Sequence, residues 1–340
     1  MASDGKVRIG VIGAGRIGKI HIENLVHRVP DAVVVAVADV ALEDTKKWAA
    51  QYGITNVVAD PKELIGDPTI DAIVICSPTS THAEYVMEAA KAGKQIFCEK
   101  PIAQKLDATR QALEAVEKAG VKLQLGFNRR FDRNFNRIRH LVDSGEIGEL
   151  HIVNITSRDP APPPLEYVKV SGGIFMDMTI HDFDMARYLV GSDVVEVYAV
   201  GNVLIDPRIK DADDFDTAVT VLQFANGVVC TIDNSRQAVY GYDQRVEVFG
   251  SKGAAAAQNE TPTKVTISNE NGVTSDKPLY FFLERYMDSF AQEMNDFVTC
   301  IKEDTAPPVT GEDGLKSLLI AMAATKSAKE KRPVSLKEIG

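Results

Sequence analysis

Short apolar runs alternate with longer amphipathic segments from Lys6 to about Gly126, and a glycine-rich stretch directly follows the first apolar run. The apolar runs have the length of buried strands, and the amphipathic segments carry apolar residues three and four positions apart, as helices do. This alternation predicts a parallel sheet with helices on both faces. The predicted strands are Val7–Ile12, Val33–Ala38, Ala72–Cys76, Gln95–Cys98 and Lys122–Leu125, and the predicted helices are Ile17–Val29, Leu42–Tyr52, His82–Ala92 and Leu106–Ala119.

The pattern changes after Gly126, where period-two stretches become dominant and predict a mostly antiparallel open sheet. We expect strands at His151–Thr156, Thr217–Phe224, Val228–Asn234 and Arg245–Phe249, helices at Asn134–Ser144, Phe175–Leu189, Leu283–Lys302 and Gly311–Lys331, and a Pro-rich lid or wall at Asp159–Pro164. The chain is therefore predicted to be an α/β protein of two domains. Residues 1–126 form a doubly wound parallel-sheet domain, and residues 127–340 form an α+β domain with a large open sheet.

Charge and hydropathy argue against several kinds of partner. The chain has 48 acidic and 38 basic residues, a net charge of −10, whereas nucleic-acid binding calls for a basic face. No apolar run approaches the roughly 20 residues that cross a bilayer. The segment Met1–Lys6 lacks the pattern of a secretion signal. We expect a cytoplasmic protein with no nucleic-acid partner and no membrane partner.

The cysteines give no sign of a metal site. They are Cys76, Cys98, Cys230 and Cys300, and no two of them form a C-x-x-C pair. A zinc site needs closer ligand spacing, so we interpret them as buried reduced thiols.

The glycine-rich stretch has the spacing G-x-G-x-x-G, directly after a predicted strand and at the start of a predicted helix. In this context the first glycine permits a tight turn, the second lets the backbone approach a pyrophosphate, and the third allows close helix–strand packing. The free N–H groups of the helix start face the phosphates. The sequence thus predicts a Rossmann-type dinucleotide site that includes Gly13, Ala14, Gly15, Arg16, Ile17 and Gly18.

The residue that ends the second predicted strand indicates which dinucleotide binds. Asp39 lies about twenty residues beyond Gly18, where a carboxylate accepts hydrogen bonds from the adenosine ribose. No Arg or Lys follows it directly to receive a 2′-phosphate, so NAD is favoured over NADP. The alternative is that Asp39 only caps the next helix.

Two later strand ends are expected to complete the cofactor cleft, because ligands of open parallel sheets bind at the carboxyl ends of the strands. After the third strand, Ser77, Pro78 and Thr79 are expected to line the nicotinamide ribose. His82 is expected to head the next helix or to stand in the cofactor shell.

After the fourth strand, two opposite charges precede a proline. Lys100 is expected to project at the reacting oxygen, while Glu99 contacts the ribose or steers the lysine. Pro101 fixes the backbone after them. A simple ion pair at a strand terminus is the alternative interpretation.

In the second domain, Asp177, His181 and Asp184 share one face of a predicted helix, at positions i, i+4 and i+7. A histidine flanked by carboxylates is a good proton acceptor near neutral pH. The alternatives are a solvated polar face and a divalent metal site. We favour no metal, because Lys100 supplies the positive charge that a metal would otherwise bring.

The stretches GAGRIG, EKP, GFNRRFD and GGIFMDMTIHDFD resemble the glucose–fructose oxidoreductase/inositol dehydrogenase superfamily over nearly the whole chain. More specific stretches, SRDPAPPP, DNSRQAVYGYDQRVEVFGSKG and YFFLERY, resemble its bacterial inositol 2-dehydrogenases. The resemblance implies NAD as cofactor and oxidation of myo-inositol to 2-keto-myo-inositol (scyllo-inosose). It further implies that Lys100, Asp177 and His181 are the catalytic residues. The residues that it places near the nicotinamide or the polyol are Asn128, Arg129, Asp184, Tyr240 and Tyr242. The two tyrosines are expected on one side of an extended strand.

The chemistry then expected is proton removal by His181, oriented by Asp177, with Lys100 steadying the developing alkoxide. An exchange of roles, with Lys100 as the base, is the alternative mechanism. Another cyclic polyol or a pyranose sugar, such as scyllo-inositol, chiro-inositol or glucose, is the alternative substrate. A non-catalytic nucleotide sensor is the remote alternative, against which the three catalytic residues argue.

A homo-oligomer is expected, because an open sheet with an exposed apolar face tends to be covered by another subunit. The resemblance implies a tetramer formed through the C-terminal sheet.

Overall fold

The computed structural model describes residues 5–340, so most of the N-terminal segment considered for a secretion signal lies outside the described part. The chain forms two compact units. Unit 1 comprises the chain up to Phe131 together with Asp288–Lys316, and unit 2 comprises Asp132–Met287 and Ser317–Gly340. Unit 1 thus includes a late segment that the division at residue 126 assigned to the second domain.

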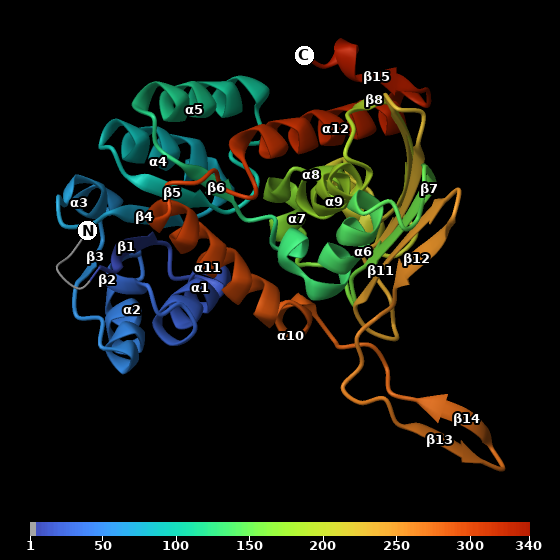
Figure 1. The fold of residues 1–340 in the computed structure, drawn as a ribbon, viewed down its shortest axis with the longest axis horizontal. Coiled ribbons are helices and arrows are strands. Elements are labelled where there is room, and N and C mark those ends of the chain that lie inside the picture. Colours follow the sequence, from blue (N-terminus) through green and yellow to red (C-terminus); the bar gives the residue numbers. More distant parts are fainter. Residues whose placement is uncertain (1–4) are drawn as a thin grey trace. The chain divides into compact units, whose positions relative to one another are not determined.

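Unit 1 contains a six-stranded parallel sheet with the order β3-β2-β1-β4-β5-β6 (Figure 1). Its strands are short and almost wholly apolar, as expected where helices cover both faces. This order is that of a doubly wound dinucleotide-binding sheet, with the reversal between β1 and β4. The strands are β1 (Val7–Ile12), β2 (Ala32–Ala38), β3 (Val57–Val58), β4 (Ala72–Ile75), β5 (Gln95–Cys98) and β6 (Leu123–Leu125).

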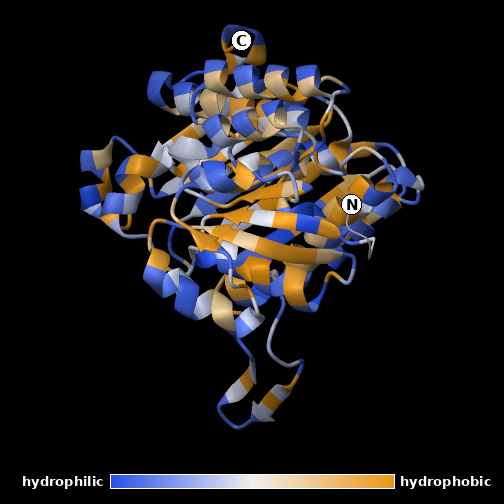
Figure 2. Cartoon of the chain, turned by 90° about the vertical axis from the view of Figure 1, so that its left-hand side faces the viewer, coloured by the Kyte–Doolittle hydropathy of each residue, from blue (hydrophilic) through white to orange (hydrophobic). Residues whose placement is uncertain are grey.

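Helices of unit 1 cover this sheet, and α4 and α5 lie side by side (Figure 1). They are α1 (Arg16–His27), α2 (Leu42–Ala49), α3 (Pro61–Gly66), α4 (Thr79–Lys91), α5 (Leu106–Ala119) and α11 (Met287–Lys302). Figure 2 shows almost continuously hydrophobic strands in the parallel sheet and helices that alternate hydrophilic and hydrophobic residues. This is the pattern from which strands and helices were predicted.

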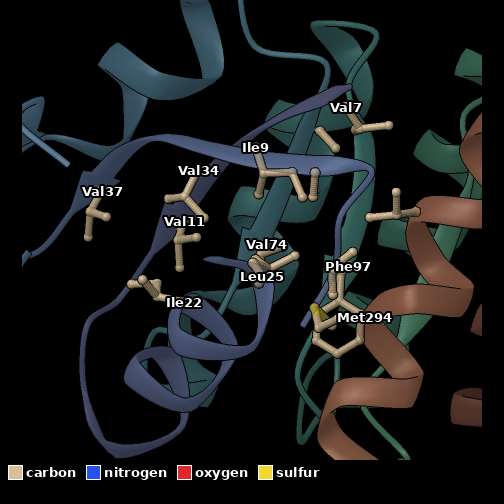
Figure 3. Close-up of a cluster of buried hydrophobic side chains, with 14 of the residues drawn as sticks. Val7, Ile9, Val11, Ile22, Leu25, Val34, Val37, Val74, Phe97 and Met294 are labelled. Atoms are coloured by element: carbon tan, nitrogen blue, oxygen red, sulfur yellow. The ribbon is translucent and has the colours of Figure 1, made fainter. Parts of the chain in front are cut away.

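A single apolar cluster joins α1, the strands and α11. Val11 and Val74 point from the sheet toward Ile22 of α1, and Phe97 of β5 packs near Met294 of α11 (Figure 3). All five side chains are fully buried. Helix α11 therefore completes the core of unit 1, although about 160 residues of unit 2 separate it from β6 in the sequence.

Unit 2 contains a seven-stranded sheet with the order β12-β11-β7-β10-β9-β8-β15. Strands β7 and β10 pair in parallel and the other neighbours pair antiparallel, as predicted for a mostly antiparallel sheet. The strands are β7 (Leu150–Arg158), β8 (Val194–Asn202), β9 (Thr217–Phe224), β10 (Val229–Ser235), β11 (Asp243–Gly250), β12 (Gly253–Ala257) and β15 (Val334–Ser335).

One face of this sheet is buried and the other is open. Along β9 the side chains of Ala218, Thr220 and Leu222 are buried, while Val219 between them is 49% exposed. Helix α9 contacts β7, and Ser327 of α12 accepts a hydrogen bond from the Ala199 N–H of β8. The helices of unit 2 are α6 (Arg133–Asp143), α7 (Leu165–Ser171), α8 (Ile174–Asp177), α9 (Ile180–Val190), α10 (Phe282–Arg285) and most of α12 (Gly311–Glu330).

A two-stranded hairpin, β13 (Thr266–Asn269) and β14 (Gly272–Ser275), extends away from the seven-stranded sheet (Figure 1). Every residue of its two strands is exposed. Among residues 5–340, no helix has the length and apolar character needed to cross a membrane. The predicted fold class is confirmed.

Candidate active site

Three glycines shape the loop between β1 and α1. Gly13 has a φ of +93°, and a Cβ there would stand 2.7 Å from the backbone of Cys76 and Ser77. A Cβ on Gly18 would stand 1.9 Å from the Gly13 carbonyl oxygen, so α1 approaches the loop only because residue 18 lacks a side chain. No described atom lies within 4 Å of the Cβ position of Gly15. The loop therefore has a fixed turn, an open middle and a closely packed helix start, which suits a dinucleotide pyrophosphate.

Asp39 follows β2 and fixes that loop. Its Oδ2 accepts a hydrogen bond from the Ala14 N–H at 2.6 Å, and its Oδ1 accepts one from the Ala41 N–H at 2.8 Å. The carboxylate thus joins the glycine loop to the start of α2. It remains partly exposed at the strand end where the adenosine ribose is expected. Its contact with a ribose stays a prediction.

His82 bridges the loops that follow β4 and β5. Its Nε2 lies 2.7 Å from the Ser77 carbonyl oxygen, and its Nδ1 lies 2.8 Å from the Pro101 carbonyl oxygen. Burial lowers the pKa of His82, although the two carbonyls oppose this shift. Helix α4 begins at Thr79, three residues before the predicted start, so His82 lies in its first turn, and its place in the cofactor shell stays a prediction. The buried imidazole holds together the two strand ends expected around the nicotinamide.

Glu99 belongs to a buried cluster with His21 of α1 and Glu293 of α11. His21 Nε2 lies 2.8 Å from Glu99 Oε1 and 3.9 Å from Glu293 Oε1. Rings of Phe97 and Phe290 meet the imidazole edge-on. Burial raises the pKa of Glu293 well above its usual range, and the charge of Glu99 raises it further.

This cluster has the donor types of a small cation site, since one ligand atom from each of His21, Glu99 and Glu293 lies within 4.8 Å of the others. The separation of 2.8 Å between His21 and Glu99 is that of a charge-assisted hydrogen bond. A hydrogen bond between the imidazole and the carboxylate therefore accounts for the close approach of these two groups. The neutral form of Glu293 accounts for a carboxyl group whose two oxygens have no hydrogen-bond partner among the described residues.

The remaining predicted residues of unit 1 lie close behind these strand ends. Lys100 is the second residue after β5 and is partly buried. A Cβ on Gly126 would stand 2.8 Å from Glu99 Oε2, so this carboxylate packs against the backbone that follows β6. Asn128 and Arg129 form the start of a 3-10 turn, and both side chains are buried.

In unit 2 the predicted helix Phe175–Leu189 is two helices. Helix α8 ends at Asp177 and α9 begins at Ile180, with Met178 and Thr179 between them. Asp177 and His181 therefore stand on separate helices, and the prediction of one continuous helical face is wrong. The Thr179 side chain turns inward and donates to the Asn234 Oδ1 at 2.9 Å, which anchors the break to strand β10.

Asp177 contacts side chains from distant parts of unit 2. The Tyr167 hydroxyl of α7 donates to Asp177 Oδ1 at 2.7 Å, and Arg236 Nη1 lies 3.4 Å from Asp177 Oδ2. Desolvation of the hydroxyl raises the pKa of Tyr167, although the residue is 48% exposed, and the charge of Asp177 raises it further, so the phenol stays a donor. The carboxylate is held on both oxygens.

Behind α9, buried polar side chains fix the helix to the sheet. Asp184 is 1% exposed and His181 is partly exposed. Asn234 Nδ2 donates to the buried carboxylate of Asp182 at 2.8 Å. The polar residues of α9 thus do not form a solvated surface.

The two predicted tyrosines do not share one side of a strand. Tyr240 lies in a turn before β11, and its hydroxyl donates to Asp243 Oδ2 at 2.5 Å. Tyr242 is buried against the rings of Phe281 and Tyr286. Gly241 between them has a φ of +131°, which interrupts the extended backbone.

The structure thus brings the predicted residues together within each unit. In unit 1 the glycine loop, Ser77, His82 and the segment after β5 meet at the carboxyl ends of the strands. In unit 2 Asp177, His181 and Asp184 lie on consecutive helices. The approach of Lys100 to the residues of unit 2 stays a prediction.

Sequence reasoning missed Tyr167, Arg236, His21 and Glu293. Arg236 directly follows β10, so a charge at the end of a period-two strand was the available signal. Glu293 was detectable only as an acid within an apolar helical pattern.

The fold and the glycine loop define a dinucleotide-dependent oxidoreductase, and comparison with known proteins agrees. Residues 7–127 match the family model described as "Oxidoreductase family, NAD-binding Rossmann fold", and residues 139–336 match "Oxidoreductase family, C-terminal alpha/beta domain". The chain belongs to this GFO/IDH/MocA oxidoreductase family. The predictions of family and of NAD as cofactor are confirmed.

Individual relatives cover the chain almost completely. The protein is 54% identical to the uncharacterized oxidoreductase YrbE of Bacillus subtilis, over 96% of each chain. It is 52% identical to the myo-inositol 2-dehydrogenase of Thermotoga maritima, over 98% of this chain and 99% of that one. It also resembles the crystal structure of scyllo-inositol dehydrogenase from Lactobacillus casei with bound NAD(H) and scyllo-inositol, with a TM-score of 0.91, 30% identity, and coverage of 98% of this chain and 99% of that one.

Proposed function

We propose that the protein is an NAD-dependent inositol 2-dehydrogenase that oxidises myo-inositol to 2-keto-myo-inositol. The observation that carries this proposal is the 52% identity with a myo-inositol 2-dehydrogenase over nearly the whole of both chains. The presence of Lys100, Asp177 and His181 in this chain supports catalysis over a sensing role.

The cofactor would be held by the residues at the carboxyl ends of the unit 1 strands. The open backbone at Gly15 fits a pyrophosphate, and Asp39 would accept the ribose hydroxyls. Ser77, Pro78, Thr79 and Glu99 would border the nicotinamide end, with His82 holding the loops behind them. When bound, NAD accepts the hydride that leaves the carbinol carbon.

Side chains of the protein would remove the hydroxyl proton of the substrate and stabilise the negative charge that develops on its oxygen. His181 takes the hydroxyl proton, because a neutral imidazole is a good base near pH 7. Lys100 faces the same oxygen and stabilises the negative charge that grows there. Asp177 orients the imidazole and the substrate, and Asn128, Arg129, Asp184 and Tyr240 contribute hydrogen bonds to the polyol or support its pocket.

The test is NADH formation by the purified protein with NAD or NADP and a panel of myo-inositol, scyllo-inositol, D-chiro-inositol and glucose. NAD-linked turnover that is highest with myo-inositol is the expected result. A preference for another polyol would overturn the substrate, and silence with the whole panel would overturn the enzymatic function. His181→Ala and Lys100→Ala separate the two chemical roles, because the wild-type rate falls at low pH as the base is protonated. Loss of the base should therefore remove this acidic fall in rate and cost more at high pH than at low pH.

We also propose a homotetramer in which the open face of the unit 2 sheet is covered. Ile152, Val200, Val219 and Phe249 are all more than 40% exposed and come from four strands of that sheet, β7, β8, β9 and β11, with β10 between β7 and β9. An apolar face of this extent favours association. Val219→Glu is expected to shift the mass measured by light scattering toward smaller species, whereas the control Val40→Glu, at an isolated exposed position of unit 1, should leave it unchanged.

The proposed location is the cytoplasm. Its support is the reduced state of Cys98, Cys230 and Cys300, which are free and buried. Burial raises the pKa of Cys98, which keeps this thiol unreactive. Cell fractionation with activity as the readout tests the location.

A further inference from the structure

Arg236 is the largest fully buried side chain among the described residues, yet no part of the chemistry proposed above uses it. Its guanidinium lies between two carboxylates of unit 2. Nη1 is 3.4 Å from Asp177 Oδ2, and Nη2 is 3.5 Å from Asp214 Oδ2. A buried guanidinium with two acidic partners is expensive to desolvate, so its retention calls for a reason.

The two acids stand at opposite ends of one short helix. Asp214 Oδ1 accepts a hydrogen bond from the Ile174 N–H at 2.8 Å, at the first residue of α8. Asp177 is the last residue of α8. Arg236 therefore spans the four-residue helix and ties its start to its end through side chains.

The glycine before α8 is part of this arrangement. Gly173 has a φ of +87°, and a Cβ there would stand 2.7 Å from Asp214 Oδ1. Residue 173 must lack a side chain for Asp214 to reach the helix start. Gly173 thus permits a close approach between the start of α8 and Asp214.

Tyr167 holds the other oxygen of Asp177. It comes from α7, which follows the Pro-rich loop Asp159–Pro164, and its hydroxyl donates to Asp177 Oδ1 at 2.7 Å. With Arg236 on Oδ2, the carboxylate has a donor on each oxygen and one orientation.

We propose that Arg236 and Tyr167 are positioning residues of the dehydrogenase reaction, which together fix the Asp177 carboxylate. This rests on the proposed function, because Asp177 is the group that orients the base and the polyol. Neither residue touches the reacting atoms. They act by keeping Asp177 in the geometry that the reaction needs, and a misplacement of about 1 Å in such a group lowers the rate on the order of 100-fold.

The test compares Tyr167→Phe and Arg236→Lys with matched controls. Tyr52→Phe removes a phenol that donates to Glu23 at 2.8 Å in unit 1, the same chemical contact away from Asp177. Arg285→Lys alters another buried arginine, which pairs with Asp132. For each variant we measure kcat, the KM values for polyol and NAD, and the isotope effect with substrate deuterated at the carbinol carbon.

We expect kcat to fall on the order of 10- to 100-fold in both test variants, with an unchanged KM for NAD and an isotope effect at least as large as in the wild type. The controls should keep the wild-type kcat. In an Asp177→Asn background, Tyr167→Phe and Arg236→Lys should have little further effect, because residues that act through one group are not additive. Full kcat in both variants, or losses that multiply with that of Asp177→Asn, would overturn the proposal.

Two measurements distinguish a failure of the positioning proposal from a folding defect and from a failure of the proposed function. Wild-type turnover with the polyol panel reports the function itself. Crystal structures of the two variants report the Asp177 rotamer whatever the substrate is. If Arg236→Lys does not fold, Tyr167→Phe carries the test. An Asp177 side chain that keeps its rotamer in every variant obtained would refute the positioning role.

Discussion

The buried carboxyl group of Glu293 makes a quantitative prediction about stability and pH. The side chain is fully buried in unit 1, and burial together with the charge of Glu99 raises its pKa. The unfolded chain releases this proton near pH 4.3, at about the usual value for a glutamate. Between that pH and the folded-state pKa, the native protein therefore holds one proton more than the unfolded chain.

The sign and the size of the effect follow from proton linkage. A raised folded-state pKa gives stability that is fully present below the unfolded pKa and is lost as the pH rises. The loss is about 1.4 kcal/mol for each pH unit in that window. Glu293→Gln keeps the shape of the neutral acid and does not titrate. The free energy of unfolding of this variant, relative to the wild type, should thus rise by about 1.4 kcal/mol per pH unit until the folded-state pKa is passed.

The single tryptophan offers a local readout. Trp48 packs against the apolar cluster of unit 1, so its fluorescence reports the unfolding of that unit. Urea unfolding of both proteins is measured at several pH values from about pH 5 to about pH 9, where the two stability curves should diverge. The control Glu117→Gln, at an exposed position of α5, should give a curve parallel to the wild type. Parallel curves for Glu293→Gln as well would refute a neutral Glu293.

Three further predictions concern individual contacts. Gly18→Ala places a Cβ 1.9 Å from a carbonyl oxygen and should destabilise unit 1 by roughly 1–3 kcal/mol, as measured by the fluorescence of Trp48. NAD binding, measured by calorimetry, should be lost, and unchanged binding would contradict the packing argument. Asp39→Ala removes the acceptor of two backbone N–H groups and should weaken NAD binding by about tenfold or more, with a smaller effect on NADP binding. Equal losses of affinity for NAD and NADP would count against recognition of the ribose by Asp39. Arg285→Ala removes the cationic partner of the buried Asp132 carboxylate, whose Oδ1 keeps the backbone N–H groups of Asn134 and Phe135. It should cost unit 2 up to about 3–5 kcal/mol in urea unfolding, and a cost near zero would show that the pair is not buried in solution.

Local patterns in the sequence were sufficient to predict much of the fold. Strand β1 and helix α5 have the predicted bounds, as does β9. The strands of unit 1 are short apolar runs bounded by polar or glycine residues, and β9 alternates with period two. In both cases the pattern is set by burial on one or both faces of a sheet, which acts residue by residue.

Tertiary contacts decide the features that were missed. The segment around Thr179 has helical periodicity on both sides, but its hydroxyl bonds to Asn234 in a strand 55 residues away, and the helix breaks there. Tyr240 and Tyr242 have the spacing of one strand face, yet Gly241 between them has a positive φ and lies against the backbone of Pro278. No local pattern carries such information.

The candidate site likewise contains residues that local patterns predict and residues that only tertiary contacts bring into place. The residues at strand ends were found because the topology of a parallel sheet fixes where its strands deliver them. The groups that hold those residues come from elsewhere: Arg236 is 59 residues from Asp177, and Glu99 is 78 residues from His21. Such supporting contacts arise only once the chain has folded.

The late segment Asp288–Lys316 has a consequence for how the protein is made. A ribosome delivers the six strands of the parallel sheet first, but the side chains of Met294 and Phe297 that cover Phe97 emerge only after nearly all of unit 2 has been synthesised. Until then the part of the nascent sheet around Phe97 stays uncovered, which is the condition under which chains associate wrongly or engage chaperones. Unit 2 in turn receives its own last strand, β15, after that segment, so both units close within the final fifty or so residues of synthesis.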